Sequence, residues 1–251
     1  MKIYDKDLSK DEVIKFVTQH HNNILNNKID RFHTIINLFD ISQGQNVLDY
    51  GCGWGVYSFE LYKLGFNVTA IDISSNEIDI CKTVWSENDK LKFITSKIDD
   101  FPSSNFDFVL SNQVIEHVHN PGLYLSQINR VLKLNGFLII STPNIINPMY
   151  IFSMLSPNLE KRLITESEFY LDNYDKTHHH INLWEPTHFN RLLASCGFKL
   201  IKYIPTEGVP LPKKLKLKDY IYPKNKYIRN LSYTMTFKFQ KVKDVTISPD
   251  M

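Results

Sequence analysis

Apolar residues recur along this chain with two alternating periods, which predicts strands followed by helices. Short apolar runs are typical of buried strands, and apolar residues three or four positions apart are typical of helices. The expected strands are 46–50, 67–72, 91–95, 106–111, 136–142, 198–204 and 234–242. The expected helices are two between 10 and 39, then 54–64, 74–84, 122–132 and 186–196. Regular alternation through Thr142 predicts right-handed crossovers and a doubly wound, mostly parallel α/β sheet.

One long segment, from Pro143 to Leu183, interrupts this alternation. It contains prolines, aromatic residues and helical-looking pieces but no expected strand. Loops of that length in a compact domain usually carry function, so we expect a partly helical lid over the site. The predicted organisation is one domain over 1–251, made of N-terminal helices (1–45), a cofactor-binding half (46–142), a lid insertion (143–185) and C-terminal core strands with a basic segment (186–251).

The strongest local signal is the glycine-rich run VLDYGCGWG, residues 47–55, which joins the first strand to a helix. Glycines let a ligand touch the backbone, and the start of the helix offers free amides. In open α/β sheets, ligands bind at the carboxyl ends of strands where the strand order reverses. Asp72 ends the second strand, where a carboxylate can accept hydrogen bonds from both hydroxyls of a ribose.

Two classes of cofactor compete for such a loop. A dinucleotide requires G-x-G-x-x-G, whose third glycine permits close helix packing below a pyrophosphate. Here the spacing is G-x-G-x-G, and Val56 takes the place of that third glycine, which argues against NAD. Asp49 is poorly placed beside a pyrophosphate but well placed near a cationic amino-acid group. An ordinary structural turn without a ligand is the remaining alternative.

Four segments, taken in order, resemble the motifs of a known family. VLDYGCGWG, AIDIS, FDFVLSNQVIEHVHNP and GFLIISTPN resemble those of class I S-adenosylmethionine-dependent methyltransferases, in particular the ubiquinone-biosynthesis O-methyltransferases and their small-molecule relatives. The resemblance covers roughly residues 31–198. It implies a Rossmann-like sheet of seven strands with the last one antiparallel, and S-adenosyl-L-methionine as the cofactor.

The resemblance also implies donor-binding residues, position by position. They are Asp49, Gly51, Cys52, Gly53, Asp72, Ile73, Ile98, Asn112 and Gln113. Asp72 would bind the ribose and Ile73 would flank the adenine, while the glycine loop and 112–113 would face the methionine end. Lys97 stands where the family usually has an acidic residue, so only a packing role is expected at the residue after it.

Three residues are candidates for the chemistry of methyl transfer: Glu116, His117 and His180. The protein must align the acceptor with the methyl group and, where needed, remove a proton, and the pKa of histidine suits this task. His117 is the first candidate for a base or orienting group, with Glu116 able to set its tautomer; a packing role is the alternative. The resemblance favours His180 near the substrate pocket, whereas His178 and His179 are expected on a solvated surface.

The sequence predicts no metal requirement. Some ubiquinone-type relatives carry Glu-x-x-Glu-His, an arrangement associated with a divalent metal. This chain has Gln113 in place of the first glutamate, and a neutral amide weakens a site for a hard cation. The adjacent histidines at 178–180 lack a cysteine or clear acidic pattern that would complete a metal site.

Composition excludes some classes of protein. The chain is 43% hydrophobic and 22% charged with a formal net charge of +2, which is typical of a globular domain and gives no general attraction to nucleic acid. No apolar run approaches the ~20 residues of a membrane span, and the polar start predicts no signal peptide. Cys52, Cys81 and Cys196 lie far apart, which fits reduced thiols in the cytoplasm.

The segment 211–230 holds seven basic residues against one acidic residue, with tyrosines between them. A solvated face is the default interpretation of Lys213–Arg229. The alternatives are a patch that attracts a phosphorylated or nucleotide-linked acceptor, or an anionic membrane surface. No stable nucleic-acid partner is expected, because the rest of the chain lacks a basic footprint.

We therefore expect an S-adenosylmethionine-dependent methyltransferase that acts on a small molecule, at oxygen. The chain lacks the Asn/Asp-Pro-Pro-aromatic signature of many N-methylating enzymes at 111–114, which favours oxygen. N-methylation stays open, because the glycine loop recognises the donor and not the acceptor. Candidate acceptors are a quinone precursor and a sugar or other polysaccharide component. The alternative is a non-catalytic module whose basic C-terminal segment faces nucleic acid.

Overall fold

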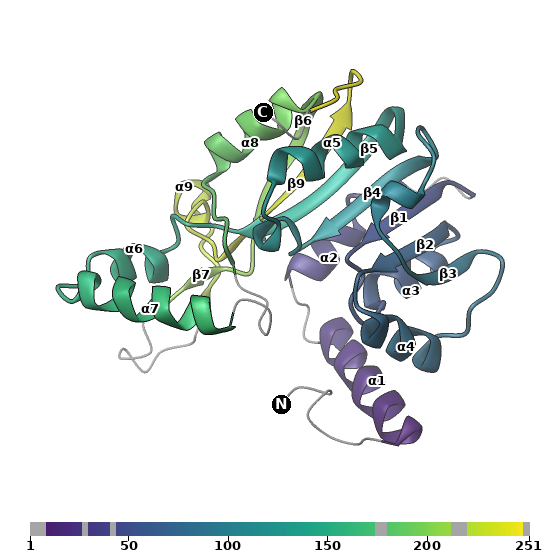
Figure 1. The fold of residues 1–251 in the computed structure, drawn as a ribbon, viewed down its shortest axis with the longest axis horizontal. Helices are drawn as coiled ribbons and strands as arrows, with labels where there is room; N and C mark the ends of the chain where they lie inside the picture. The colour runs from purple at the N-terminus through teal and green to yellow at the C-terminus, as the bar shows by residue number, and fades with distance from the viewer. Residues whose placement is uncertain (1–8, 27–29, 41–43, 174–179, 212–219, 248–251) are drawn as a thin grey trace.

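The computed structural model describes residues 9–26, 30–40, 44–173, 180–211 and 220–247 (Figure 1). Seven strands form one sheet in the order β3-β2-β1-β4-β5-β9-β6. The strands are β1 (Asn46–Tyr50), β2 (Asn67–Asp72), β3 (Leu91–Thr95), β4 (Phe106–Asn112), β5 (Leu132–Pro143), β6 (Phe198–Thr206) and β9 (Thr234–Lys241). Only β9 runs antiparallel to its neighbours β5 and β6. The predicted doubly wound sheet is confirmed, although β5 begins earlier than its glycine suggested.

Helices connect most of these strands. They are α1 (Lys10–Asn26), α2 (Asp30–Ile36), α3 (Val56–Lys63), α4 (Ser75–Val84), α5 (Pro121–Val131), α6 (Pro148–Met154), α7 (Leu159–Asn173), α8 (Pro186–Ser195) and α9 (Lys226–Arg229). Two 3₁₀ turns, η2 (Ile98–Asp100) and η3 (Ile115–His117), and a small pair of strands, β7 (Val209–Pro210) and β8 (Tyr220–Ile221), were not predicted. These pieces are too short to produce a hydrophobic period.

Polar residues at the predicted starts fix where the helices begin. The Ser74 hydroxyl accepts a hydrogen bond from the Glu77 amide at 3.4 Å and caps α4. The Asn120 side chain caps α5, and Pro121 occupies the first turn, where its missing N–H costs nothing. The Glu185 carboxylate caps α8 in the same way.

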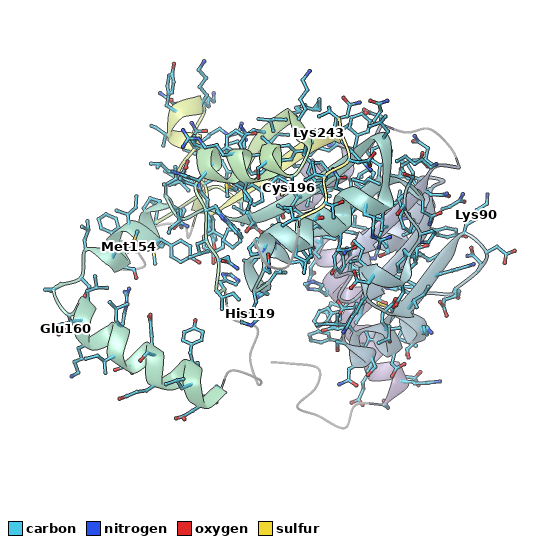
Figure 2. All side chains as sticks on the ribbon, turned by 45° about the horizontal axis from the view of Figure 1, so that its top comes forward. Lys90, His119, Met154, Glu160, Cys196 and Lys243 are labelled. Carbon is cyan, nitrogen blue, oxygen red and sulfur yellow. The ribbon has the colours of Figure 1, made fainter. Side chains whose placement is uncertain are left out.

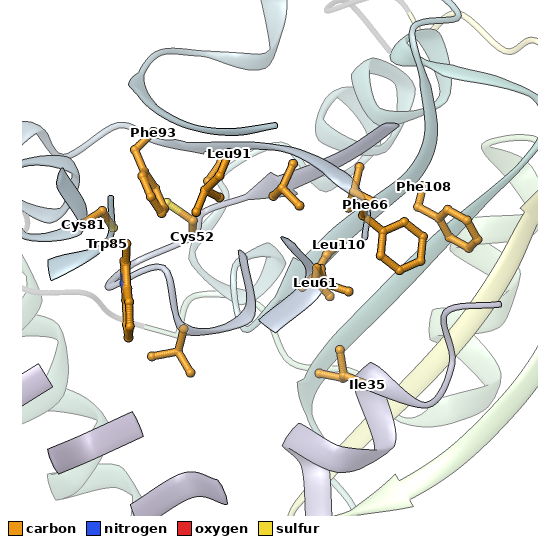
Figure 3. Close-up of a cluster of buried hydrophobic side chains, with 14 of the residues drawn as sticks. Ile35, Cys52, Leu61, Phe66, Cys81, Trp85, Leu91, Phe93, Phe108 and Leu110 are labelled. Carbon is orange, nitrogen blue, oxygen red and sulfur yellow. The ribbon is translucent and has the colours of Figure 1, made fainter. Parts of the chain in front are cut away.

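One face of the sheet is covered by α1, α2, α3 and α4. Figure 3 shows this core, in which Ile35 of α2 and Leu61 of α3 lie near Phe66, Phe108 and Leu110. The other face is covered by α5 and α8, which bury side chains such as Leu125 and Phe189. Because side chains alternate along a strand, β1 presents Val47 to the first core and Leu48 to the second.

The strand order reverses at β1, which pairs with β2 on one side and β4 on the other. The carboxyl ends of β1 and β4 therefore lie side by side, followed by the glycine turn and by Asn112. Ligands of open α/β sheets bind at such a switch point. The fold thus brings the predicted site residues to one edge of the sheet.

The segment predicted as a lid forms two helices, α6 and α7, which extend away from the sheet (Figure 1). Neither helix has a buried residue. In Figure 2, Met154 and Glu160 lie on this arm, apart from the body that carries Cys196 and Lys243. No helix in the described ranges is both long and apolar enough to span a bilayer.

Candidate active site

The glycine turn after β1 is built from left-handed backbone. Gly51, Gly53 and Gly55 have φ values of 79°, 50° and 70°, a region that side chains other than glycine rarely adopt. The amides of Gly51 and Cys52 both donate to the Ile71 carbonyl, at 2.8 and 3.0 Å. A Cβ on Gly51 would lie 2.5 Å from Val114, whereas a Cβ on Gly53 would meet nothing within 4 Å. The space beside Gly53 is therefore open.

Two hollows of about 310 Å³ each flank this turn, and both are lined by Gly51 and Gly53. The first is completed by residues that include His20, Arg31, Cys52, Asn112 and Glu207. The second is completed by residues that include Tyr50, Asp72, Ile73, Gln113 and His117. An elongated ligand can thus cross the turn with one end in each hollow.

Asp72 is held in place by backbone amides at the edge of the second hollow. One carboxylate oxygen accepts from the Gly53 amide at 3.1 Å, and the other accepts from the Ser74 amide at 2.9 Å. Each oxygen retains a further lone pair for a ligand hydroxyl. Ile73 is 74% exposed, so its side chain can pack against a flat base, while Ile98 is buried in the core.

Asp49 occupies a different position, because its register on β1 directs it to the face covered by α3. Its carboxylate is buried and accepts a 2.5 Å hydrogen bond from the Ser58 hydroxyl. Burial, with a smaller contribution from the Asp72 charge, raises the pKa of Asp49 to about 7. Asp49 lines neither hollow, so it can influence a ligand only through its charge, from the opposite side of the glycine turn. Its role toward the donor stays a prediction.

Arg31 of α2 is a candidate site residue that the sequence did not single out. It lines the first hollow, and its Nη1 lies 3.4 Å from a carboxylate oxygen of Glu207. Its Nε is buried without a hydrogen-bond partner in the part of the chain that the structure describes. A partly buried guanidinium with an unused N–H favours an anionic or carboxylate ligand. The apolar residues around Arg31 repeat with a helical period. Such a period indicates packing and carries no information about ligand binding, so the sequence did not point to Arg31.

Asn112 and Gln113 divide between the two hollows. The Asn112 side chain accepts a 2.7 Å hydrogen bond from the Ser141 hydroxyl and lines the first hollow. Gln113 has a φ of 58° and lines the second hollow, beside Asp72. Glu207, which lies at the first hollow, also has a positive φ of 64°. Strained backbone of this kind clusters at functional sites.

Glu116 lies fully buried in η3. One carboxylate oxygen accepts a 3.2 Å hydrogen bond from the Thr142 hydroxyl, and the other has no hydrogen-bond partner among the described groups. Burial raises the pKa of Glu116 to about 7, although the Thr142 hydrogen bond acts in the opposite direction. The group is therefore poised to gain or lose a proton near neutrality.

His117 and His180 come together although 63 positions separate them, with ring centroids 4.9 Å apart. The amides of Ile181 and Asn182 both donate to the Glu116 carbonyl, at 2.9 and 3.0 Å, which fixes the chain beside η3. Burial, with a smaller contribution from His117, lowers the pKa of His180. His180 also lines a separate cavity of about 520 Å³ against α6 and α7. His178 and His179 lie outside the described residues.

The ligand atoms of Glu116, His117 and His180 lie within 4.8 Å of one another. Two imidazoles and one carboxylate can also hold a transition metal. A proton-handling group and a metal site are thus both compatible with this cluster. The predicted absence of a metal requirement stays a prediction.

The basic segment is only partly described, because Lys213, Lys214, Lys216 and Lys218 lie outside the described residues. Within the rest, the Lys226 ammonium lies 5.2 Å from the centre of the Tyr227 ring. Arg229 donates to the Pro205 carbonyl at 3.4 Å. These contacts fit the solvated-face interpretation of this part of the segment.

The sheet order, the glycine turn at the switch point and the acidic residue at the end of β2 are typical of a methyltransferase fold. The chain belongs to the methyltransferase domain family, whose profile matches residues 20–203. It is an S-adenosylmethionine-dependent methyltransferase, as the sequence analysis predicted.

Among curated proteins, the chain is similar to the ubiquinone biosynthesis O-methyltransferase of Rickettsia akari, with 27% identity over 206 residues (81% of this chain and 75% of the relative). The corresponding protein of Rickettsia canadensis is 31% identical over 64% of this chain and 65% of the relative. A solved S-adenosylmethionine-dependent methyltransferase from Methanosarcina mazei superposes with a TM-score of 0.57 at 19% identity, covering 83% of this chain and 97% of that one. That likeness supports the fold alone.

Proposed function

We propose that this enzyme methylates an oxygen atom of a small-molecule acceptor, with the donor bound across the glycine turn and the acceptor in the cavity beside His180. One observation carries the proposal: His117 lines the donor hollow, His180 lines the neighbouring cavity, and the centres of the two rings lie 4.9 Å apart. A quinone precursor and a sugar or polysaccharide component are the candidate acceptors.

The first and second hollows fit the two ends of S-adenosyl-L-methionine. Asp72 binds the ribose hydroxyls, Ile73 packs against the adenine, and Arg31 binds the amino-acid carboxylate. The open space at Gly53 and the free Nε of Arg31 support this fit. When bound, the donor supplies a methyl group on a positively charged sulfur. Asp49 and Asp72 favour this cation because both carboxylates lie close to the turn.

On the acceptor side, His117 and His180 orient the hydroxyl and receive its proton. The lowered pKa of His180 keeps its imidazole neutral, which is the form that accepts a proton. A histidine that has taken the proton is a cation, and the nearby Glu116 carboxylate stabilises it. The helices α6 and α7 form two walls of the acceptor cavity, and in this proposal they act as the lid that the sequence predicts.

Replacing His117 tests the chemical role. We expect His117→Ala to bind S-adenosylhomocysteine as the wild type does and to slow methyl transfer by about 100-fold or more, because a positioned acid–base group contributes that much. Calorimetry gives the first quantity, and transfer of a labelled methyl group gives the second. His119→Ala is the matched control, because His119 is an exposed histidine two residues after His117. Equal loss in both variants contradicts the chemical role.

The same assay, run after dialysis against EDTA, tests the metal prediction. We expect wild-type turnover to be unchanged, because one carboxylate and two imidazoles act on protons in this proposal. Loss of activity that magnesium or zinc restores contradicts this expectation.

We also propose a cytoplasmic location, in which the three cysteines stay reduced; Cys52, Cys81 and Cys196 are all unpaired.

A further inference from the structure

The cavity beside His180 is lined by both polar and apolar side chains. It occupies about 520 Å³, within the range of small-molecule sites, and is walled by α6, α7 and the strand of chain that carries His180. Tyr150 and Ser153 come from α6, and Arg162, Glu166 and Tyr170 come from α7. Three apolar side chains complete the lining, so oppositely charged, aromatic and apolar groups share one cavity.

Arg162 is anchored on one side and available on the other. Its Nη1 donates to the Ser153 carbonyl at 2.8 Å and also contacts the Ser153 hydroxyl. Its Nε lies 3.3 Å from a Glu166 carboxylate oxygen, but the geometry leaves this buried nitrogen without a hydrogen bond to any described group. The Arg162 guanidinium and the Glu166 carboxylate therefore lie side by side, and the Nε–H of Arg162 remains available to a ligand.

We infer that this cavity binds a polyhydroxylated acceptor, a glycosyl group, through the Arg162–Glu166 pair; the inference rests on the function proposed above. Because the two charges cancel, a phosphate or a carboxylate gains no net attraction. An apolar ring would remove water from the pair and return no hydrogen bond. Hydroxyl groups satisfy both partners, since they accept from the guanidinium and donate to the carboxylate.

The two tyrosines fit the same class of ligand. Tyr150 and Tyr170 offer aromatic rings for the C–H face of a sugar, and Tyr150 also offers a hydroxyl for its rim. Burial raises the pKa of Tyr150, so its phenol stays protonated and can donate. His180 lines this cavity and its ring centre lies 4.9 Å from that of His117, so a sugar hydroxyl beside His180 would receive the methyl group.

Saturation-transfer NMR on the full chain with S-adenosylhomocysteine tests this inference. The probes are methyl α-D-glucopyranoside, methyl α-L-rhamnopyranoside and catechol. We expect signals from at least one glycoside, reduced about ten-fold in Arg162→Gln and Glu166→Gln, as the loss of hydrogen bonds to a charged group requires. Arg162→Lys, which keeps the charge but loses the planar fork, should fall between them and the wild type.

Lys161→Gln and Glu168→Gln are the matched controls, because they change charge on exposed positions of α7. Both should bind the glycosides as the wild type does, and thermal denaturation should show all variants folded. Signals from catechol alone, from no glycoside, or equal signals in the Arg162 and wild-type proteins overturn the inference.

Calorimetry with S-adenosylhomocysteine separates the two levels of the account. If the protein binds the donor and methylates catechol equally well with and without Arg162, the glycosyl inference fails and the proposed function stands. Absence of donor binding removes both.

Discussion

Asp72 and Arg31 lie at opposite ends of the proposed donor site, so each tests a different part of the ligand. We expect Asp72→Asn to weaken binding of both S-adenosylhomocysteine and 5′-methylthioadenosine by about 10- to 100-fold, because the ribose loses a charged hydrogen-bond acceptor. Arg31→Gln should weaken S-adenosylhomocysteine to a similar degree and leave 5′-methylthioadenosine unchanged, because the latter lacks the amino-acid carboxylate. Calorimetry measures all four affinities.

Asp79→Asn and Arg191→Gln are the controls, because both residues are exposed on α4 and α8. Neither should change either affinity. Equal weakening of the two ligands by Arg31→Gln would mean that Arg31 supports the turn and does not bind the carboxylate.

Glu116 predicts a pH-dependent stability difference. Its pKa is raised to about 7 in the folded protein, so between pH 4.5 and 7 the unfolded chain loses its proton first and stability falls as pH rises. Above pH 7 this loss is complete and amounts to about 3 kcal/mol at most. Glu116→Gln removes this loss of stability. The difference in unfolding free energy, variant minus wild type, should therefore increase from pH 5 to pH 8. Urea titrations at both values measure the gap.

A gap that stays constant with pH, or that shrinks toward pH 8, contradicts a buried Glu116 with a raised pKa. The same variant should lose activity, because Gln cannot stabilise a charged imidazole. Stability gained at the expense of turnover is typical of residues kept for function.

At this scale the sequence offered Asp72 and His117 as candidates, because residue type and position at or after a strand end carry information. His180 became a candidate through the family resemblance. It gave no signal for Arg31, Arg162 or Glu166, because each lies within a helix whose period describes packing alone. Only the fold shows that Arg31 meets Glu207 and that α7 turns two of its charged residues toward His180.

In the glycine turn, substitutions at two neighbouring glycines can separate an effect on stability from an effect on ligand binding. Both Gly53 and Gly55 have left-handed backbone, so alanine costs about 1 kcal/mol at either position. At Gly55 the new Cβ would also lie 2.7 Å from Phe93 and 3.0 Å from Cys81, two side chains that Figure 3 shows beside Cys52. We expect Gly55→Ala to lose about 2–4 kcal/mol of stability in total.

Gly53→Ala should lose only the backbone cost, because its Cβ meets no atom of the protein. That Cβ enters the space shared by both hollows, so donor affinity should fall steeply while the melting temperature changes little. Chemical denaturation and calorimetry measure the pair. A Gly53→Ala protein that binds the donor normally would show that the donor does not cross this turn.

The sequence predicted the long elements well because each buries a regular face. The strands 46–50, 67–72 and 91–95 agree with β1, β2 and β3 residue for residue. It missed η3, although this single turn positions both Glu116 and His117, because three residues are too few for a period. The long insertion was correctly expected to be helical, but its projection from the sheet depends on contacts that no local pattern records.

For the whole molecule, alternation predicted the doubly wound, mostly parallel sheet, and the family resemblance implied seven strands with an antiparallel last strand; both are confirmed. Long-range polar contacts did not follow. Lys238 reads as a solvent-facing residue of a strand, yet its ammonium is buried and donates to the Leu38 carbonyl at 2.8 Å, with Asp40 as its ionic partner. Such contacts join segments two hundred residues apart, so only the folded chain shows them.

The central claim is that one sulfonium nucleoside crosses the glycine turn between Asp72 and Arg31. A crystal structure of the protein grown with S-adenosylhomocysteine tests this most directly. The account predicts the ribose hydroxyls on the Asp72 carboxylate, the sulfur near Gly53 and the amino-acid carboxylate at Arg31. Density for the nucleoside elsewhere, or both hollows empty at saturating ligand, would contradict it.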